Sequence, residues 1–163
     1  MAVSEPIKQS VGKAIGRIPS GVFILTTQHA GQSGAMMASW VQQASFEPPT
    51  ISVAIAAGRP VADIIRASKR FALSVLGEGD AAIMKRYARG IPAGEDPFQD
   101  IKTQELPGGL QVLADSLAWM ECRLLQTVTF NADHDLYLAE VTAGQLLREG
   151  HSFMHQRGNG FHY

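Results

Sequence analysis

The sequence predicts a mainly β fold, an antiparallel barrel with a few short helices at its periphery. Runs of β-branched and aromatic residues recur along the chain, and such residues favour strands. The helix-like segments between them are few, without the regular alternation of strand and crossover helix that a doubly wound parallel sheet requires. A mostly antiparallel barrel therefore fits the pattern better.

The sequence of the first half of the chain predicts an N-terminal helix, then several strands and a short helix. Apolar residues at helical spacing predict a helix over residues 4–18, with a serine cap and a proline in its first turn. Residues 22–28 are β-branched and aromatic and predict a strand. A hairpin connection leads to a returning strand in the segment 34–50, and residues 50–56 predict a buried strand. Residues 58–70 predict a short helix, whose early acidic and late basic residues suit its dipole.

The second half predicts further strands around one short helix. Residues 71–76 predict a strand, and residues 80–89 predict a helix with an aspartate cap and a glycine stop. Residues 91–109 are rich in Pro, Gly and charged residues, so they predict a long loop. Two long strands are expected over residues 117–130 and 136–147, joined by the tight connection "NADHD".

The composition and charge are those of an ordinary globular protein. The 163 residues fit a single domain over residues 1–163, with 45% apolar and 18% charged residues. A formal net charge of -1 gives no electrostatic reason to expect nucleic acid or an acidic membrane as a partner. The apolar runs are too short to span a bilayer, and the N-terminus lacks the order of a signal peptide. Because Cys122 is the single cysteine, we expect no intrachain disulfide and a cytoplasmic location.

The turn Gly58-Arg59-Pro60 is a candidate anion-binding site. Gly58 lets a ligand approach the backbone, and Pro60 fixes a first helical turn whose free N–H groups favour an anion. Arg59 can grip a phosphate with two parallel hydrogen bonds. The alternative is an ordinary strand-to-helix turn with a solvated arginine.

The segment "GAMMASWVQQASFEPPT" (34–50) is unusually polar for a core strand and unusually apolar for a surface loop. Its small side chains permit a flat ring to lie close to the backbone. Ser39, Gln43 and Ser45 can supply polar contacts, and Trp40 can cover a ring face. A flavin, which has an apolar body and a hydrogen-bonding edge, suits these features. The alternative is an edge strand with one wet face.

His134 is the candidate functional histidine. It lies between Asp133 and Asp135 in the connection between the two long strands, where it can overhang a pocket at the end of a barrel. The alternative is a polar turn residue.

The remaining reactive side chains predict neither a metal site nor a nucleophile. His151 and His155 are four apart and would share a helix face, but no third ligand at metal-site spacing lies nearby in the sequence. We therefore expect no metal. Cys122 lies among apolar strand residues without a histidine partner, so we interpret it as structural. The sequence has no GxSxG, GxGxxG, P-loop or HExxH pattern.

Taken together, these segments resemble the flavin reductase-like FMN-binding split-barrel family, in the order that the family has them. The resemblance covers residues 14–163 and rests on "IPSGVFILTT", "AMMASWVQQASFEPP", "AGRPVADIIRASKRFALSVL" and "NADHDLYLAEV". Four pieces, "GRIPSG", "GAMMASWVQQASF", "PAGEDPF" and "GNGFHY", resemble a subgroup, the C-terminal flavin reductase module of flavodiiron proteins of oxygenic phototrophs. The sequence has no histidine- and carboxylate-rich diiron domain and no flavodoxin domain, so it is either an excised module or a stand-alone relative.

The resemblance implies a Greek-key split barrel that forms a homodimer and binds FMN at or near the subunit interface. It implies reduction of the flavin by NADH or NADPH, with electrons passing on to a flavin, oxygen or a protein acceptor. Carried over by position, the residues expected to meet the isoalloxazine ring are Met37, Ala38, Ser39 and Trp40. Those expected along its polar edge or the ribityl chain are Gln43, Ala44 and Ser45. The turn of Gly58 and Arg59 would hold the phosphate, and His134 would lie on the nicotinamide side as the catalytic residue.

Two other functions stay open on the sequence alone. One is a non-catalytic FMN-binding electron relay within a larger flavodiiron-type protein that also has flavodoxin-like domains. The other is a dimerising barrel that binds no flavin.

Overall fold

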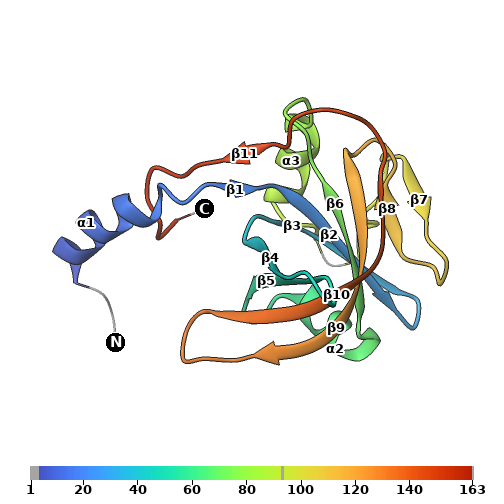
Figure 1. Cartoon of the computed structure of the whole chain (residues 1–163), viewed down its shortest axis with the longest axis horizontal. Helices are drawn as coiled ribbons and strands as arrows, with labels where there is room; N and C mark the ends of the chain where they lie inside the picture. Colours follow the sequence, from blue (N-terminus) through green and yellow to red (C-terminus); the bar gives the residue numbers. More distant parts are fainter. Residues whose placement is uncertain (1–3, 93, 163) are drawn as a thin grey trace.

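A seven-stranded antiparallel sheet forms the centre of the computed structural model, which describes residues 4–92 and 94–162 (Figure 1). Its strand order is β3-β2-β6-β9-β10-β5-β4. In chain order the strands are β2 (Phe23–His29), β3 (Gln32–Ala38), β4 (Val41–Ser45), β5 (Thr50–Ala56), β6 (Arg70–Val75), β9 (Ala118–Val128) and β10 (His134–Leu146). The neighbouring strands pair antiparallel, which confirms the predicted mainly β, antiparallel fold.

The sheet curls into a barrel that is split between its two edge strands, β3 and β4. These strands are consecutive in the chain, and Ser39 and Trp40 separate them. The Trp40 carbonyl oxygen accepts a hydrogen bond from the Ala54 N–H at 3.0 Å. The segment 34–50, which the sequence predicts as one returning strand, is therefore two strands joined at this break, because β3 pairs with β2 whereas β4 pairs with β5.

Alternating burial along β5 fills the barrel interior. Ile51, Val53 and Ile55 are buried, while the residues between them are half-buried. They join Phe71 of β6 and Tyr137 of β10 in one apolar cluster. Full burial of such side chains contributes about 1.5–3 kcal/mol each to folding, so this inward face holds the curled sheet together.

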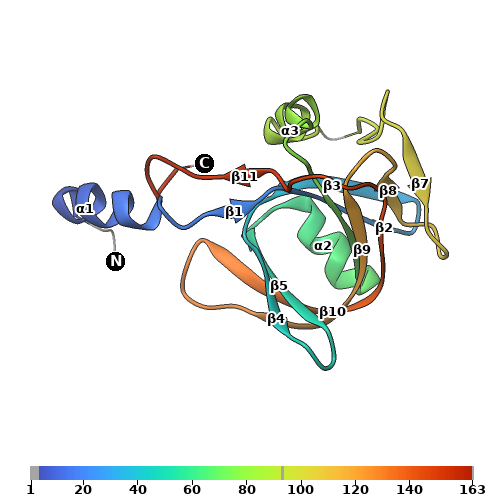
Figure 2. The ribbon, with the colours of Figure 1, turned by 45° about the horizontal axis from the view of Figure 1, so that its top comes forward.

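The helices of the barrel are short, as predicted. α2 (Pro60–Ser68) packs against β2 and β3 and lies within the curve of the sheet, where its Val61 and Ile65 are buried (Figure 2). α3 (Ala81–Ala88) lies beside β3 and buries Tyr87, whose hydroxyl donates a hydrogen bond to the Pro97 carbonyl at 2.8 Å. Within residues 4–92 and 94–162, no helix is long and apolar enough to cross a membrane.

The long loop predicted over residues 91–109 carries one short strand near its end. β7 (Thr103–Glu105) pairs with β8 (Gln111–Leu113) as a small separate hairpin. This strand forms because Leu106, Leu110 and Val112 are buried in a small apolar cluster that anchors the hairpin.

An arm built from both ends of the chain projects from the barrel (Figures 1 and 2). It contains α1 (Glu5–Ile15) and the short strands β1 (Ser20–Gly21) and β11 (Met154–His155), which pair antiparallel. The helix ends earlier than its predicted end at residue 18, because the N–H groups of Arg17 and Ile18 close turns that lead into β1.

The C-terminal tail is packed closely on α1. The Gly160 N–H donates a hydrogen bond to the Gly12 carbonyl at 2.6 Å. A methyl group at Gly16 would lie 2.7 Å from the Arg157 carbonyl oxygen, so a larger side chain there would push the tail away. Gly12 of α1 and Gly16 at its C-cap therefore fix where the tail runs.

Candidate functional site

A groove of about 580 Å³ opens between the arm and the split in the barrel. The barrel side includes the two residues of the break between β3 and β4, Ser39 and Trp40, together with Val41, Ala54 and Leu136. The side formed by the arm and tail includes Ile15, Ile18, Phe153, Met154 and Arg157. Among the described residues that line this groove, Arg157 is the only one with a charged side chain. The groove is thus a largely apolar surface with a single cation.

Three side chains from distant parts of the chain meet at Trp40. The ring centroids of Trp40 and His134 lie 4.6 Å apart, with the ring planes tilted by 42°. The guanidinium carbon of Arg157 lies over the Trp40 ring, 5.0 Å from its centroid. Trp40 therefore links the break in the barrel, the start of β10 and the C-terminal tail.

His134 is held in one orientation by its neighbour Asp133. His134 is buried, and its Nδ1 lies 2.8 Å from Oδ1 of the exposed Asp133. The hydrogen bond from His134, followed by the coulombic interaction with it, lowers the pKa of the Asp133 carboxyl. An ionised carboxylate accepts hydrogen bonds only, so Nδ1 of His134 carries the proton and donates it. The β10–β5 register, which places His134 opposite Ala56, fixes the backbone of the pair.

The turn with Gly58 and Arg59 begins next to this pair. The Ala57 N–H donates a hydrogen bond to the Asp133 carbonyl at 2.9 Å, so the turn leaves β5 beside the start of β10. Gly58 has φ +79°, a conformation that favours glycine, and the space where its side chain would be is open. Arg59 is exposed and occupies the N-cap position of α2 without a side-chain capping hydrogen bond, and Pro60 lies in the first turn. The structure thus has the exposed helix start that the sequence predicts.

Of the predicted flavin-ring residues, Ser39 and Trp40 line the groove. Met37 packs against a second apolar cluster on the α3 side, and Ala38 is buried in the barrel core. Gln43 and Ala44 are exposed on β4. Contacts of Met37 or Ala38 with a ligand would therefore involve their backbone more than their side chains, and their role stays a prediction.

Ser45 lies at the end of β4 and is engaged in a turn. Its hydroxyl donates a hydrogen bond to the Pro48 carbonyl at 2.5 Å, and its own carbonyl accepts one from the Gln43 side chain at 3.4 Å. The role predicted for Ser45 along the ribityl chain stays a prediction.

Arg157 is a candidate site residue that no local sequence pattern marks. The residue lies in a short mixed tail, far along the chain from Trp40. The signal that could have found it is the glycine-rich stretch that follows it, "GNG", which indicates a tail that needs close backbone approach.

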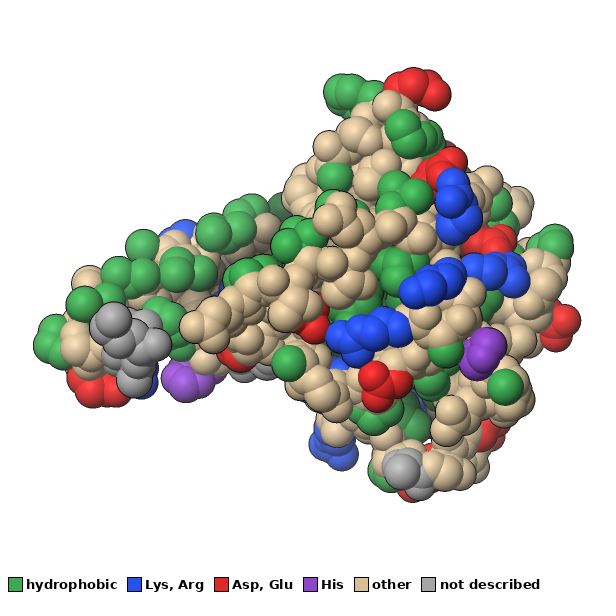
Figure 3. All heavy atoms as spheres, turned by 90° about the horizontal axis from the view of Figure 1, so that it is seen from below, with side chains coloured by type: hydrophobic (Ala, Val, Ile, Leu, Met, Phe, Trp, Pro, Cys, Tyr) green, Lys and Arg blue, Asp and Glu red, His purple; other side chains and the backbone are tan. Residues whose placement is uncertain are grey.

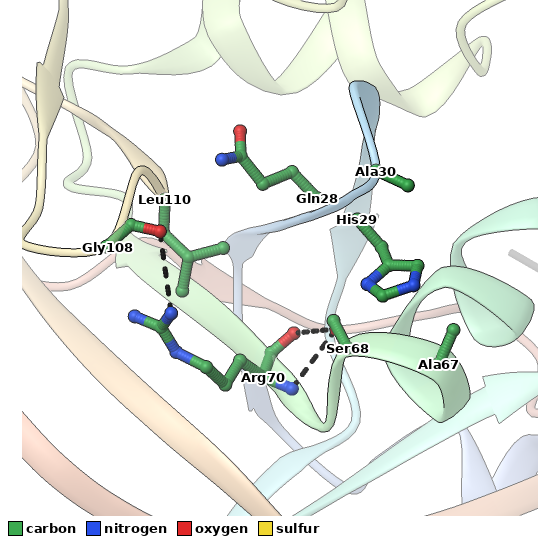
Figure 4. A pocket seen from close by; sticks show the side chains of 8 residues that line it. All are labelled: Gln28, His29, Ala30, Ala67, Ser68, Arg70, Gly108 and Leu110. Atoms are coloured by element: carbon green, nitrogen blue, oxygen red, sulfur yellow. Dashed lines mark hydrogen bonds between the residues drawn. The ribbon is translucent and has the colours of Figure 1, made fainter.

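A second hollow of about 280 Å³ lies at the end of β2, beside the C-terminal end of α2 (Figure 4). Its polar lining residues are Gln28, His29, Ser68 and Arg70. Arg70 donates to the Pro107 carbonyl at 3.2 Å and pairs with Glu121, and the Ser68 hydroxyl donates to the Arg70 carbonyl at 2.9 Å. Because the Ser68 hydroxyl and the Arg70 guanidinium already have partners within the protein, the groove at Trp40 is the better candidate for the functional site.

Comparison with known protein families identifies the family to which the chain belongs. The family described as flavin reductase like domain matches residues 15–161. The chain belongs to this flavin reductase-like family. Membership confirms the resemblance drawn from the sequence, and the split of the barrel agrees with it.

Individual proteins that resemble this flavin reductase-like domain are consistent with the family assignment. The chain is 40% identical over 153 residues to diflavin flavoprotein A 1 of Synechocystis sp., a match that covers 93% of the chain and 26% of the relative. The chain thus spans about a quarter of the length of the curated relatives that it matches. Among solved structures, an NADH:FAD oxidoreductase from Streptomyces globisporus has a TM-score of 0.85 at 21% identity, covering 97% of this chain and 93% of that one. The flavin reductase PheA2 has a TM-score of 0.77 at 25% identity, covering 94% and 98%.

The groove of the flavin reductase-like domain fits a planar cofactor. Its volume of about 580 Å³ lies within the roughly 300–1,000 Å³ that is usual for small-molecule sites. Its apolar lining with a few hydroxyls and one cation suits an aromatic ring that carries polar atoms on one edge.

Proposed function

We propose that this domain binds FMN and catalyses its reduction by NADH or NADPH. The observation that carries the proposal is the position of Trp40, which lies in an apolar groove between His134 and Arg157, in a member of the flavin reductase-like family. A flavin oxidoreductase needs such a surface for a flat ring and needs little acid–base machinery.

Two parts of the chain would hold the cofactor. Ser39 and Trp40, with the adjacent β4, would contact the ring, because they line the groove at the break in the barrel. The turn of Gly58 and Arg59 would hold the phosphate with the guanidinium of Arg59 at the start of α2. The hydrogen bond between Ala57 and Asp133 keeps this turn beside His134.

His134 would orient the nicotinamide of NAD(P)H and would not serve as an acid or base. A bound FMN would supply the acceptor for a hydride from NAD(P)H, that is, for two electrons and one proton. Asp133 holds Nδ1 of His134 in a hydrogen bond, which fixes the orientation of the imidazole ring. With its imidazole fixed by Asp133 and Trp40, His134 can orient the carboxamide of the nicotinamide.

A homodimer is part of this proposal, because the arm exposes apolar surface beside the groove. Figure 3 shows hydrophobic side chains gathered along the arm. Ile18 is 63% exposed and Met154 is 73% exposed, and both also line the groove. Ile7 and Val11 extend the same surface along α1. Exposed apolar surface of this kind is characteristic of interaction sites, and a second copy would cover it and narrow the groove.

A second candidate function is electron relay within a longer protein. The chain spans about a quarter of the length of its diflavin flavoprotein relatives, which favours a module that exchanges electrons with further domains. In that case the flavin would be reduced by a neighbouring domain and not by NAD(P)H.

Anaerobic stopped-flow mixing tests the proposal and separates the two functions. The purified domain is first titrated with FMN, and we expect saturable binding with quenching of tryptophan fluorescence. The complex is then mixed with NADH and with NADPH, and we expect at least one of them to bleach the flavin absorbance. Binding without bleaching would leave electron relay as the function, and a failure to bind FMN would reject both.

A further inference from the structure

We propose that Arg157 binds the oxygen-bearing edge of the flavin ring and makes the bound flavin easier to reduce. The proposal rests on the proposed function above, since it concerns how the same groove treats its cofactor. It assigns a role to a residue of the C-terminal tail, outside the segments that the sequence analysis selected.

The fold places Arg157 by several independent contacts. Pairing of β11 with β1, with His155 opposite Ser20, brings the tail to the groove. The close approach of the tail to Gly16 then sets the backbone of Arg157 itself. The stacking of its guanidinium on Trp40 fixes the end of the side chain. The side chain is thus positioned at both ends and does not simply extend into solvent.

Among the described residues, no carboxylate pairs with Arg157, whose guanidinium lies over the Trp40 ring. Several other arginines form ion pairs with carboxylates: Arg66, Arg70, Arg123 and Arg148. Within the part of the chain that the structure describes, Arg157 forms no ion pair, and the hydrogen bond from its Nη1 to the Gly160 carbonyl is long, at 3.5 Å. Because no other described residue that lines the groove is charged, the half-buried guanidinium of Arg157 can interact strongly with a ligand.

Two features favour the ring edge over the phosphate as the group that Arg157 binds. The phosphate has a separate candidate site, because Arg59 follows the end of β5 and is not among the residues that line the groove. Arg157 lies on the aromatic ring that is expected to contact the flavin. The planar guanidinium presents paired donors in a fixed geometry, which suits adjacent acceptors on a heterocycle. A cation beside the ring favours the electron-rich, reduced form, which is one way in which proteins tune flavins.

The test compares oxidised and reduced flavin in three variants. Arg157→Met removes the charge but keeps a long side chain, Arg157→Lys keeps the charge without the planar donors, and Arg17→Met is the matched control. Arg17 is an exposed arginine of the same arm that does not line the groove. Circular dichroism and the melting temperature establish that each variant is folded. The readouts are the Kd values of FMN and of riboflavin, the reduction potential of each bound flavin and the KM for NAD(P)H.

For Arg157→Met we expect the affinity for oxidised FMN and oxidised riboflavin to fall equally, by about tenfold, as for loss of a charge-assisted hydrogen bond. We expect a further loss of about tenfold for the reduced forms, which makes the potential about 30 mV more negative for a two-electron couple. Arg157→Lys should change the reduction potential of the bound flavin much less than Arg157→Met does. Arg17→Met should have the same affinities and potential as the wild type.

Three results would overturn the proposal. An unchanged potential in Arg157→Met would mean that the charge does not act on the ring. A loss confined to FMN would make Arg157 a phosphate ligand. A raised KM for NAD(P)H with unchanged flavin affinity would assign it to the nucleotide. If the wild-type domain binds no flavin, the proposed function itself fails, and that result is distinct from all three.

Discussion

The rings of Trp40 and His134 lie with their centroids 4.6 Å apart, although they come from opposite ends of the barrel sequence. Trp40 lies where the chain leaves one edge strand for the other, and His134 begins β10. The contact joins the split of the barrel to the strand that runs beside β5, so the flat surface offered by Trp40 and the imidazole of His134 belong to a single site.

Replacement of His134 tests its positioning role. We predict that His134→Ala slows flavin reduction by NAD(P)H by about tenfold or more, because an imperfectly placed substrate loses much of the advantage of orientation. FMN should remain bound, since its expected ring and phosphate contacts lie on other residues. Stopped-flow absorbance gives the rate, with His29→Ala as the control because His29 is exposed in the second hollow. Equal rates in the two variants would remove His134 from the mechanism.

Cys122 should behave as a structural residue. It is fully buried in the barrel core, and burial, with the charge of Glu121 as the smaller cause, raises its pKa from 9.0 to about 12. The thiolate fraction near neutral pH is therefore about a thousandfold lower than for a free thiol. We predict that Ellman's reagent reacts with the unfolded chain and not with the native one. Fast modification of the native protein would show that the thiol is accessible.

The same shift predicts a loss of stability in alkali. The folded thiol keeps its proton up to a pH of about 12, whereas the unfolded thiol releases it near 9.0. The unfolded state thus binds fewer protons in this window, and the free energy of unfolding falls as pH rises through it. Denaturant titrations of the wild type and Cys122→Ala at pH 8 and pH 10 check this, with a smaller alkaline loss expected for the variant.

The elements of the fold were predictable where the pattern is local. The alternation in β5 and the apolar spacing of α2 are properties of short windows, and these elements lie close to the predicted ranges. The break at Ser39 and Trp40 was not predictable in this way. It depends on which distant strand each half of the segment joins, as the hydrogen bond from Ala54 to the Trp40 carbonyl shows.

The residues of the candidate site likewise differ in whether a local sequence pattern marks them. Trp40, His134 and Arg59 were identified from residue type and position, because indole, imidazole and guanidinium at strand ends and helix starts suggest ligand contacts. Arg157 was missed because its position depends on the pairing of β11 with β1 and on the close contact of the tail with Gly16. Both are long-range contacts, for which a short window of sequence has no signal.

Arg59 should distinguish FMN from riboflavin. We predict that Arg59→Ala lowers the affinity for FMN by about tenfold or more and changes the affinity for riboflavin little. Only FMN carries the phosphate that a guanidinium would bind. Fluorescence titration with both flavins measures the two losses. Lys69→Ala is a suitable control, since Lys69 is an exposed cation at the opposite end of α2. Equal losses for the two flavins would remove Arg59 from phosphate binding.

The arm should hold two copies of the domain together, and a charge placed on it should separate them. We predict that Ile18→Asp converts a dimer into a monomer near 17.6 kDa, because an aspartate at a covered apolar contact would have to lose its hydration. Leu146→Asp is the matched control, since Leu146 is 60% exposed on β10, away from the arm, whereas Ile18 is 63% exposed. Light scattering after size exclusion gives the mass, and FMN titration of the same samples shows whether the groove needs the second copy. A wild-type monomer, or a dimer that survives Ile18→Asp as well as it survives Leu146→Asp, would refute the role of the arm. If the dimer dissociates and FMN affinity falls with it, the apolar surface beside Trp40 and the flavin site are one interface.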